Sequence, residues 1–416
     1  MTATTLTAAA PRHSPAMPAW LAPLLALACG LIAANLYLAQ PLAGPISAAL
    51  GLSPQAAGLI VMLTQAGYGI GLLLVVPLGD LMENRRLAVV LISLAALALL
   101  AAALATHPAP FLAAALAVGL GSVAVQVLVP YAAHLAPEAA RGRVVGNVMS
   151  GLLLGIMLAR PASSLLAGLS SWRLPFEVFA GAMLLLALTL RLALPARAPA
   201  TRLHYGGLLA SMGRLALRTP ALRRRALYHA FMFGAFSLFW TTTPLLLAGP
   251  AFHLSQNGIA LFALAGAAGA IAAPFAGRLA DRGWTRPATA LSMVAVAGAF
   301  LITRLAPEGS GLALGLLVAA ALLLDCAVSV NMTLGQRAIF MLGAEVRGRL
   351  NGLYMATFFV GGALGSGLGA WLYAHGGWPL AAWAGAALPI FGLVYLATEG
   401  REDAATVNVG AGCAAR

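Results

Sequence analysis

Residues Gly277–Arg286 read Gly-Arg-Leu-Ala-Asp-Arg-Gly-Trp-Thr-Arg and form a short polar break between two long apolar runs. A less regular copy, Pro77-Leu-Gly-Asp-Leu-Met-Glu-Asn-Arg-Arg86, lies almost half the chain earlier. Asp80 and Asp281 hold equivalent positions in the two copies. Because each copy separates hydrophobic segments, the pair predicts a membrane protein built from a duplicated unit.

The composition indicates that lipid is the main solvent of this chain. Of 416 residues, 61% are hydrophobic and 8% are charged, whereas soluble domains carry roughly 25% charged residues. All 24 basic residues are arginine, and they give a net charge of +13 against 11 acids. The absence of lysine excludes a phosphate-binding P-loop and a Schiff-base lysine. The arginines lie in short loops between apolar runs, which favours membrane topology over binding to nucleic acid.

The sequence lacks the residue spacings that are typical of a metal site or of an enzyme active site. The three cysteines have neither the spacing of a zinc site nor that of a disulfide framework. No nucleophile stands in a recognisable arrangement with a base. We therefore expect no metal, no cofactor and no enzymatic activity.

The apolar runs have the length of membrane-spanning helices. A hydrocarbon core of about 30 Å needs about 20 helical residues, and unpaired backbone groups are not tolerated in lipid. The predicted fold class is an all-α membrane protein with 12 transmembrane helices. The predicted spans are 20–40, 55–78, 87–105, 111–134, 144–168, 175–193, 224–247, 257–279, 287–304, 311–335, 350–374 and 379–397.

The positions of the arginines predict the orientation. Loops after even-numbered spans carry most of them, including Arg85, Arg86, Arg143 and Arg337, whereas loops after odd-numbered spans carry Arg173 and little else. Loops rich in arginine stay on the cytoplasmic side. Both termini are therefore predicted to be cytoplasmic.

Internal repeats divide the chain into two halves. Arg141-Gly-Arg-Val-Val-Gly146 matches Arg347-Gly-Arg-Leu-Asn-Gly352, and Trp172 matches Trp378 at the same offset. These matches predict two pseudo-symmetric six-helix bundles. The predicted domains are a disordered N-terminal lead (1–18), the first bundle (19–194), a cytoplasmic linker (195–223), the second bundle (224–397) and a C-terminal tail (398–416). Residues 203–218 of the linker could form a basic amphipathic helix on the membrane surface.

Two ionisable residues lie deep within predicted spans. Asp325 is the only acid near the bilayer midplane, where loss of hydration disfavours the charged carboxylate. Such a group can bind a proton near neutral pH, so Asp325 is the candidate for proton coupling; the alternative is a neutral carboxyl that only bonds a neighbouring helix. Arg160 could bind an anionic group of a substrate or pair with Asp325. Otherwise its side chain would extend toward the membrane surface or bond the backbone near Pro161.

Other polar residues complete a candidate substrate cavity. Amide, hydroxyl and indole groups within spans either face water or bond between helices, and both interpretations stay open. The candidate cavity comprises Asn35, Tyr37, Gln40, Gln65, Gln126, Arg160, Trp240, Asn331 and Tyr354.

These motifs resemble those of the major facilitator superfamily of secondary transporters. The superfamily loop motif Gly-x-Leu-Ala-Asp-Arg-x-Gly-Arg-Arg is matched from Gly277 to Arg286, and the first-half copy keeps Asp80 and Arg86. The runs Asn35-Leu-Tyr-Leu-Ala-Gln-Pro41 and Thr64-Gln-Ala-Gly-Tyr68 resemble the bacterial drug- and sugar-efflux branch, which includes drug:proton antiporters. The resemblance covers nearly the whole chain.

The resemblance implies a conformational latch between the halves. In the superfamily the first-half acid holds the halves together when the pathway faces outward, which assigns this role to Asp80, with Arg86 and Arg141 nearby. Asp281 and Arg282 would act symmetrically. The alternative is that these residues only cap helices and fix the topology.

The expected function is secondary transport by alternating access across the bacterial inner (plasma) membrane. The scattered polar groups in an apolar cavity suit a small amphipathic molecule, and the resemblance implies its efflux by proton-coupled antiport. The expected partners are a small-molecule substrate, protons and the lipid bilayer, without nucleic acid, and the protein is expected to be a monomer. The alternatives are a proton-coupled importer or facilitator of a small metabolite, and a membrane sensor or scaffold that transports nothing.

Overall fold

The computed structural model describes residues 18–196, 204–268, 278, 282–343 and 346–399. Across these ranges every regular element is helical, and nine helices are long and apolar enough to cross a membrane. The shorter apolar helix α1 is additional to these nine. The chain is therefore a multi-pass membrane protein. The number of twelve spans and the side on which the termini lie stay predictions.

The first half consists of helices and short 3₁₀ segments in chain order. They are α1 (Leu21–Ala34), η1 (Gln40–Leu42), α2 (Ala43–Leu50), η2 (Pro54–Ala56), α3 (Leu59–Leu74), η3 (Val76–Asp80), α4 (Asn84–Leu104), α5 (Pro108–Ser122), α6 (Ala124–Leu135), η4 (Glu138–Ala140), α7 (Arg141–Leu169) and α8 (Leu174–Ala193). The predicted first span, 20–40, is regular only to Ala34. Beyond Ala34 the backbone tightens, because the N–H groups of Asn35, Leu36 and Tyr37 bond the carbonyl oxygens three residues earlier.

The second half follows a linker helix. The linker contains α9 (Tyr205–Arg218), close to the predicted amphipathic segment, and the later elements are α10 (Pro220–Ala248), α11 (Gln256–Ala263), η5 (Leu264–Ala268), α13 (Thr285–Ile302), α14 (Gly311–Phe340) and α15 (Arg347–Ala397). The helical geometry of α15 is interrupted at Gly376 and Gly377, where Gly377 has φ 61°. This break falls between the predicted spans 350–374 and 379–397.

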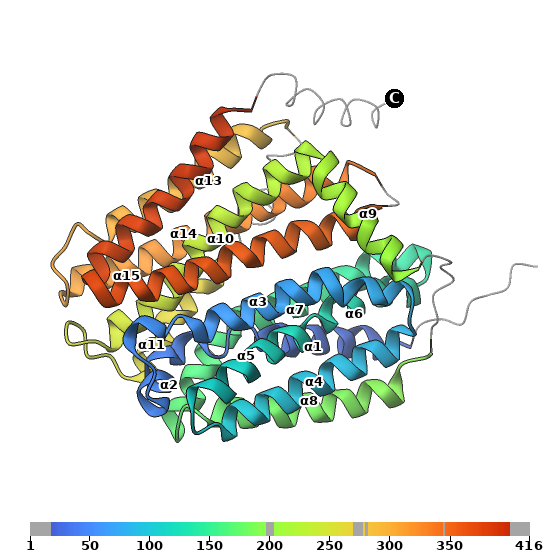
Figure 1. The fold of residues 1–416 in the computed structure, drawn as a ribbon, viewed down its shortest axis with the longest axis horizontal. Coiled ribbons are helices and arrows are strands. Elements are labelled where there is room, and N and C mark those ends of the chain that lie inside the picture. The colour runs from blue at the N-terminus through green and yellow to red at the C-terminus, as the bar shows by residue number, and fades with distance from the viewer. Residues whose placement is uncertain (1–17, 197–203, 269–277, 279–281, 344–345, 400–416) are drawn as a thin grey trace, which may run out of the picture.

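The helices form two layers that meet along a seam (Figure 1). In one layer α1 packs on α7 and α4 packs on α5 and α8; in the other, α10 packs on α15 and α13 packs on α14 and α15. Across the seam α3 contacts α15, and α7 contacts α11 and η5. These contacts do not establish where the two predicted six-helix bundles begin and end, so the bounds of the bundles stay a prediction.

The seam is closed at one end of the molecule. Here η1 and α2 contact α10, and η2 contacts α15. The backbone of Gly58, just before α3, lies so close to α15 that a Cβ there would overlap the carbonyl oxygen of Ser366. The opposite end, where α9 lies in Figure 1, holds a cavity between the layers that is described below.

Glycine contacts hold helix pairs together within each layer. A Cβ on Gly155 of α7 would overlap the carbonyl oxygen of Gly30 on α1, and a Cβ on Gly365 of α15 would overlap that of Gly234 on α10. Small residues allow this close packing between membrane helices. The pairs fix the position of α1 and α7 on one side of the seam and of α10 and α15 on the other.

Candidate transport site

A buried arginine lies at the centre of the molecule. Arg160, on α7, is only 2% exposed. Its Nε donates a hydrogen bond of 2.7 Å to Oε1 of Gln40 in η1. Its guanidinium carbon lies 4.9 Å from the ring centroid of Tyr37 and 5.1 Å from that of Phe236. Arg160 therefore faces the interior, and the alternative in which it extends toward the membrane surface does not describe this structure.

Trp240 on α10 connects Arg160 to the buried acid. The guanidinium carbon of Arg160 lies 4.4 Å from the Trp240 ring centroid, and the indole Nε1 donates a 2.9 Å hydrogen bond to Oδ2 of Asp325. Asp325, on α14, is 6% exposed, and Trp240 contacts both Asp325 and Arg160. The structure thus brings together five predicted site residues, Tyr37, Gln40, Arg160, Trp240 and Asp325, from both sides of the seam.

Several buried polar atoms of the predicted site residues lack a protein partner. Among the described residues, Nη2 of Arg160, Nε2 of Gln40, both amide atoms of Asn35 and Nδ2 of Asn331 are buried without a hydrogen bond. Leaving a buried polar atom unpaired costs about 1–3 kcal/mol. Unpaired groups in a folded protein are therefore candidates for bonding a ligand or water. The unpaired nitrogens of Arg160 and Gln40, two side chains that bond each other, fit a site that receives a polar molecule.

Two other predicted cavity residues bond to neighbouring helices. Nε2 of Gln65 donates to Oγ of Ser237 at 3.0 Å across the seam, and Nε2 of Gln126 donates to the Tyr68 hydroxyl at 3.0 Å. The Tyr68 ring lies 4.4 Å from that of Phe359, also across the seam. These contacts form a polar and aromatic layer between α3 and the helices α10 and α15.

Tyr354 lies in a separate cluster of the second half. Its hydroxyl is 2.6 Å from Nδ1 of His229, and it is fully buried. The side chains packed with it are Leu222, Ala226, Ile339 and Leu350. The structure therefore does not bring Tyr354 together with Arg160.

The cavity at the α9 end has a volume of about 470 Å³ and opens between the two halves. It is lined from the first half by Leu72, Val76, Pro77, Gly79, Asp80, Asn84, Gln126, Val127, Pro130, Tyr131 and His134, from the linker helix by Leu208 and Met212, and from α15 by Gly348, Arg349, Asn351 and Gly352. Nη1 of Arg349 donates a 2.7 Å hydrogen bond to Oγ of Ser211 on α9. The cavity thus has an acid, Asp80, and an arginine, Arg349, contributed by different halves.

Of the predicted latch residues that the structure describes, Asp80 is not joined to Arg86 or Arg141. Nε of Arg141 donates to the carbonyl oxygen of Ala133 at 3.1 Å, and Arg86 is exposed. Within the described part of the chain Asp80 has no ion pair. Arg282 is exposed, and Asp281 lies outside the described residues. The arginine that lines the same cavity as Asp80 is Arg349, which sequence reasoning did not select.

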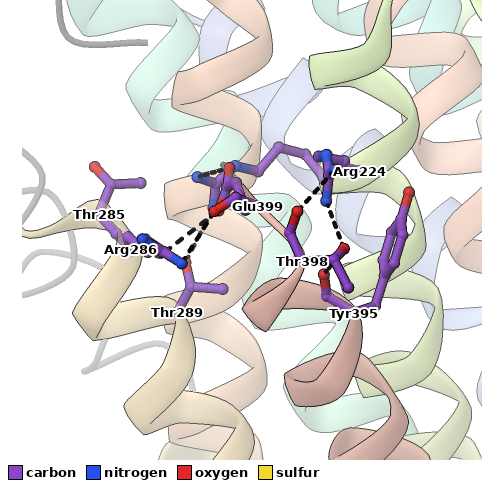
Figure 2. Close-up of polar contacts among 8 residues, drawn as sticks. Arg224, Thr285, Arg286, Thr289, Tyr395, Thr398 and Glu399 are labelled. Carbon is purple, nitrogen blue, oxygen red and sulfur yellow. Dashed lines mark hydrogen bonds and ion pairs between the residues drawn. The ribbon is translucent and has the colours of Figure 1, made fainter. Parts of the chain in front are cut away.

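Sequence reasoning also missed an ionic cluster around Glu399, at the end of α15 (Figure 2). Its carboxylate oxygens lie 3.8 Å from Nη2 of Arg225 on α10 and 3.8 Å from Nε of Arg286 on α13. Arg225 also donates to Oγ1 of Thr289 at 3.1 Å. The available signal was an acid directly after the last apolar run, in a protein with few acids.

Comparison with known proteins decides the family. The model of the Major Facilitator Superfamily matches residues 25–339. The chain belongs to this superfamily. Uncharacterized transporter YgaY of Escherichia coli O157:H7 is 41% identical over 371 residues, covering 89% of this chain and 93% of the relative. Probable transporter SCO4007 of Streptomyces coelicolor is 35% identical, covering 86% and 82%.

A more distant relative is named for drug efflux. Chloramphenicol efflux pump Rv0191 of Mycobacterium tuberculosis is 27% identical over 252 residues, covering 59% of this chain and 60% of the relative. Superfamily membership and these relatives identify the chain as a membrane transporter and not an enzyme. The resemblance noted from the loop motifs is confirmed.

Solved structures show the same fold. A bacterial homolog of the human lysosomal transporter Spinster, inward-facing and occupied, matches with a TM-score of 0.70 at 15% identity and covers 95% of this chain and 97% of its own. The inward-open xylose transporter XylE from E. coli matches with a TM-score of 0.66 at 14% identity, covering 93% and 99%. At these identities the matches establish the Major Facilitator Superfamily fold alone.

Proposed function

We propose that this transporter exports a small amphipathic molecule across the bacterial inner membrane by proton-coupled antiport. The name of the Mycobacterium tuberculosis relative, a chloramphenicol efflux pump, supports export. The aromatic rings and amides around Arg160 suit a molecule with both apolar and polar parts. Asp325 is the proposed proton site.

The observation that carries this proposal is that Trp240 contacts both Asp325 and a cation that the other half supplies. Trp240 and Asp325 belong to the second half and Arg160 to the first. When Asp325 takes up a proton, its attraction for Arg160 is lost, so protonation changes the contact across the seam. A substrate that donates a hydrogen bond to the Asp325 carboxylate competes with the proton, as antiport requires.

In this proposal the two halves of the protein move relative to each other by alternating access. The halves touch where η1 and α2 meet α10, and the cavity lined by Asp80 and Arg349 separates them at the other end. Rocking of the halves about the central group would close this cavity and open the opposite end. In the closed form Asp80 would bond the N-terminal end of α15, where Arg349 lies, and so act as the latch.

A second candidate is a proton-coupled importer, and Arg160 is the observation that favours it. An anionic substrate bound to this guanidinium would be repelled by the Asp325 carboxylate. Protonation of Asp325 would therefore strengthen binding of the anion, and the two would move together. This linkage produces symport instead of antiport.

Everted membrane vesicles with an acidic interior separate these candidates. The probes are radiolabelled chloramphenicol and a panel of neutral and anionic aromatic compounds. An exporter accumulates its substrate inside such vesicles, and the Asp325→Asn variant at equal protein amount does not. Loss of a preloaded anionic compound from the vesicles would instead support the importer. If wild-type and Asp325→Asn vesicles behave alike, Asp325 is not the coupling residue.

A further inference from the structure

A groove on the outer surface of the second half is separate from the transport site. It has a volume of about 360 Å³ and runs between the start of α13 and the end of α15. Its lining consists of Arg286, Pro287, Ala290, Leu393, Leu396 and Ala397. Apart from the arginine, every lining side chain is apolar.

The surface around this groove has the character of a lipid-facing surface near a membrane boundary. On α13, Leu291 and Val294 are 68% and 52% exposed, and on α15, Phe391 and Val394 are 59% and 62% exposed. Trp284, immediately before α13, is 60% exposed. Exposed aliphatic residues on membrane helices contact acyl chains, and tryptophan is enriched at the level of the headgroups. These exposures fit a groove that begins at the headgroup level and continues into the apolar region.

The arginine at this boundary belongs to a cluster with excess positive charge (Figure 2). Glu399 lies between Arg225 and Arg286, and its side chain is only 5% exposed. Arg224 adds a third guanidinium, which donates to Oγ1 and the carbonyl oxygen of Thr398. Two guanidinium groups thus share the Glu399 carboxylate, and a third bonds the neighbouring Thr398. The Arg286 side chain is 43% exposed, so the positive charge reaches the surface at the rim of the groove.

We propose that this groove binds an anionic phospholipid. Its phosphate would lie against the exposed Arg286 guanidinium, and one acyl chain would lie along Pro287, Ala290 and Leu393. Charge complementarity favours an anionic over a zwitterionic headgroup, because basic residues near the membrane surface attract anionic lipids. The apolar lining favours a lipid over a free anion, since a soluble anion would gain nothing from the groove.

Native mass spectrometry of the full-length protein in detergent tests this proposal. Equal amounts of dioleoyl phosphatidylglycerol and dioleoyl phosphatidylcholine are added, and the lipid retained on the protein is counted. The wild type is expected to retain one phosphatidylglycerol in preference to phosphatidylcholine. Arg286→Gln should lower this retention about fivefold, the effect of one arginine near an anionic surface. Equal retention of both lipids by the wild type would overturn the proposal.

Two further variants and a control separate lipid binding from the structural role of Arg286. Ala290→Phe fills the groove while leaving Glu399 and both of its arginines in the chain, and should lower retention of phosphatidylglycerol, whereas Arg286→Lys should largely keep it. Arg143→Gln removes an exposed arginine in the first half and should change nothing. If Ala290→Phe retains as much phosphatidylglycerol as the wild type, the groove is not the binding site.

Discussion

The guanidinium carbon of Arg160 and the ring centroid of Trp240 lie 4.4 Å apart across the seam between the two halves. The same indole donates to Asp325, so one aromatic side chain contacts both the buried cation and the buried acid. Each of the three residues comes from a different helix. We therefore expect a change in the charge of Asp325 to alter the electrostatic interactions at the contact between the halves.

Removing either central charge should destabilise the protein. Removing both should destabilise it by less than the sum of the two single effects. Arg160→Gln leaves Asp325 without its neighbouring cation, and Asp325→Asn leaves Arg160 without its acid. Leaving a buried polar group without its neighbour costs about 1–3 kcal/mol. The stability of the two single variants and of the double variant is measured by unfolding in detergent. A double variant that is destabilised by the sum of the single effects would show that the two charges do not interact.

Glu399→Gln should destabilise the second half because it leaves two arginines without their shared acid. Loss of a charged partner at a buried site costs about 1–3 kcal/mol. Glu308→Gln is the matched control, since Glu308 pairs with Arg304 on the surface at 3.5 Å. A pair of this kind contributes about 0.5 kcal/mol or less. The unfolding midpoints of both variants are measured in the same detergent. Equal shifts of the two midpoints would contradict a stabilising role of the Glu399 cluster.

Gly155→Ala should weaken packing between α1 and α7. The added Cβ would overlap the carbonyl oxygen of Gly30, and overpacking of a tight contact costs about 1–3 kcal/mol. Gly146→Ala, on the same helix, meets no atom within 4 Å and should be neutral or slightly stabilising. The measured quantities are the yield from membranes and the unfolding midpoint. A Gly155→Ala protein as stable as Gly146→Ala would show that α1 and α7 do not pack as described.

Asp80→Asn should slow transport without lowering the amount of protein in the membrane. If Asp80 is the latch, its loss removes a charge-assisted hydrogen bond of about 1.5 kcal/mol from one conformation, close to a tenfold change in population. Glu83→Gln is the control, because Glu83 pairs with Arg85 in its own loop at 3.0 Å. Wild-type flux at equal surface amount would leave Asp80 with a role in topology alone.

Features that rest on a repeated motif or on the length of an apolar run could be predicted from the sequence. Apolar runs of membrane length predicted most long helices, and the loop motif identified the superfamily. The depth of Asp325 followed from its position within an apolar run. Helix α9 lies close to where the basic amphipathic pattern placed it.

Features that depend on packing between distant segments could not be read from the sequence. Nothing in the pattern shows that Trp240 lies between Arg160 and Asp325, because this arrangement depends on how α7, α10 and α14 meet. Tyr354 resembled the cavity residues by type and depth, yet its helix face points to His229. Glu399 was assigned to the tail because the apolar run ends before it, although it is buried by arginines from two other helices.

The central claim is that Asp325 couples transport to protons, and proton flux in proteoliposomes tests it most directly. Purified wild type and Asp325→Asn are reconstituted with a pH-sensitive dye inside, and a substrate found in the vesicle screen is added outside. We expect substrate to drive proton movement through the wild type, and Asp325→Asn to bind substrate without moving protons. Substrate-driven proton flux of wild-type size through Asp325→Asn would contradict it.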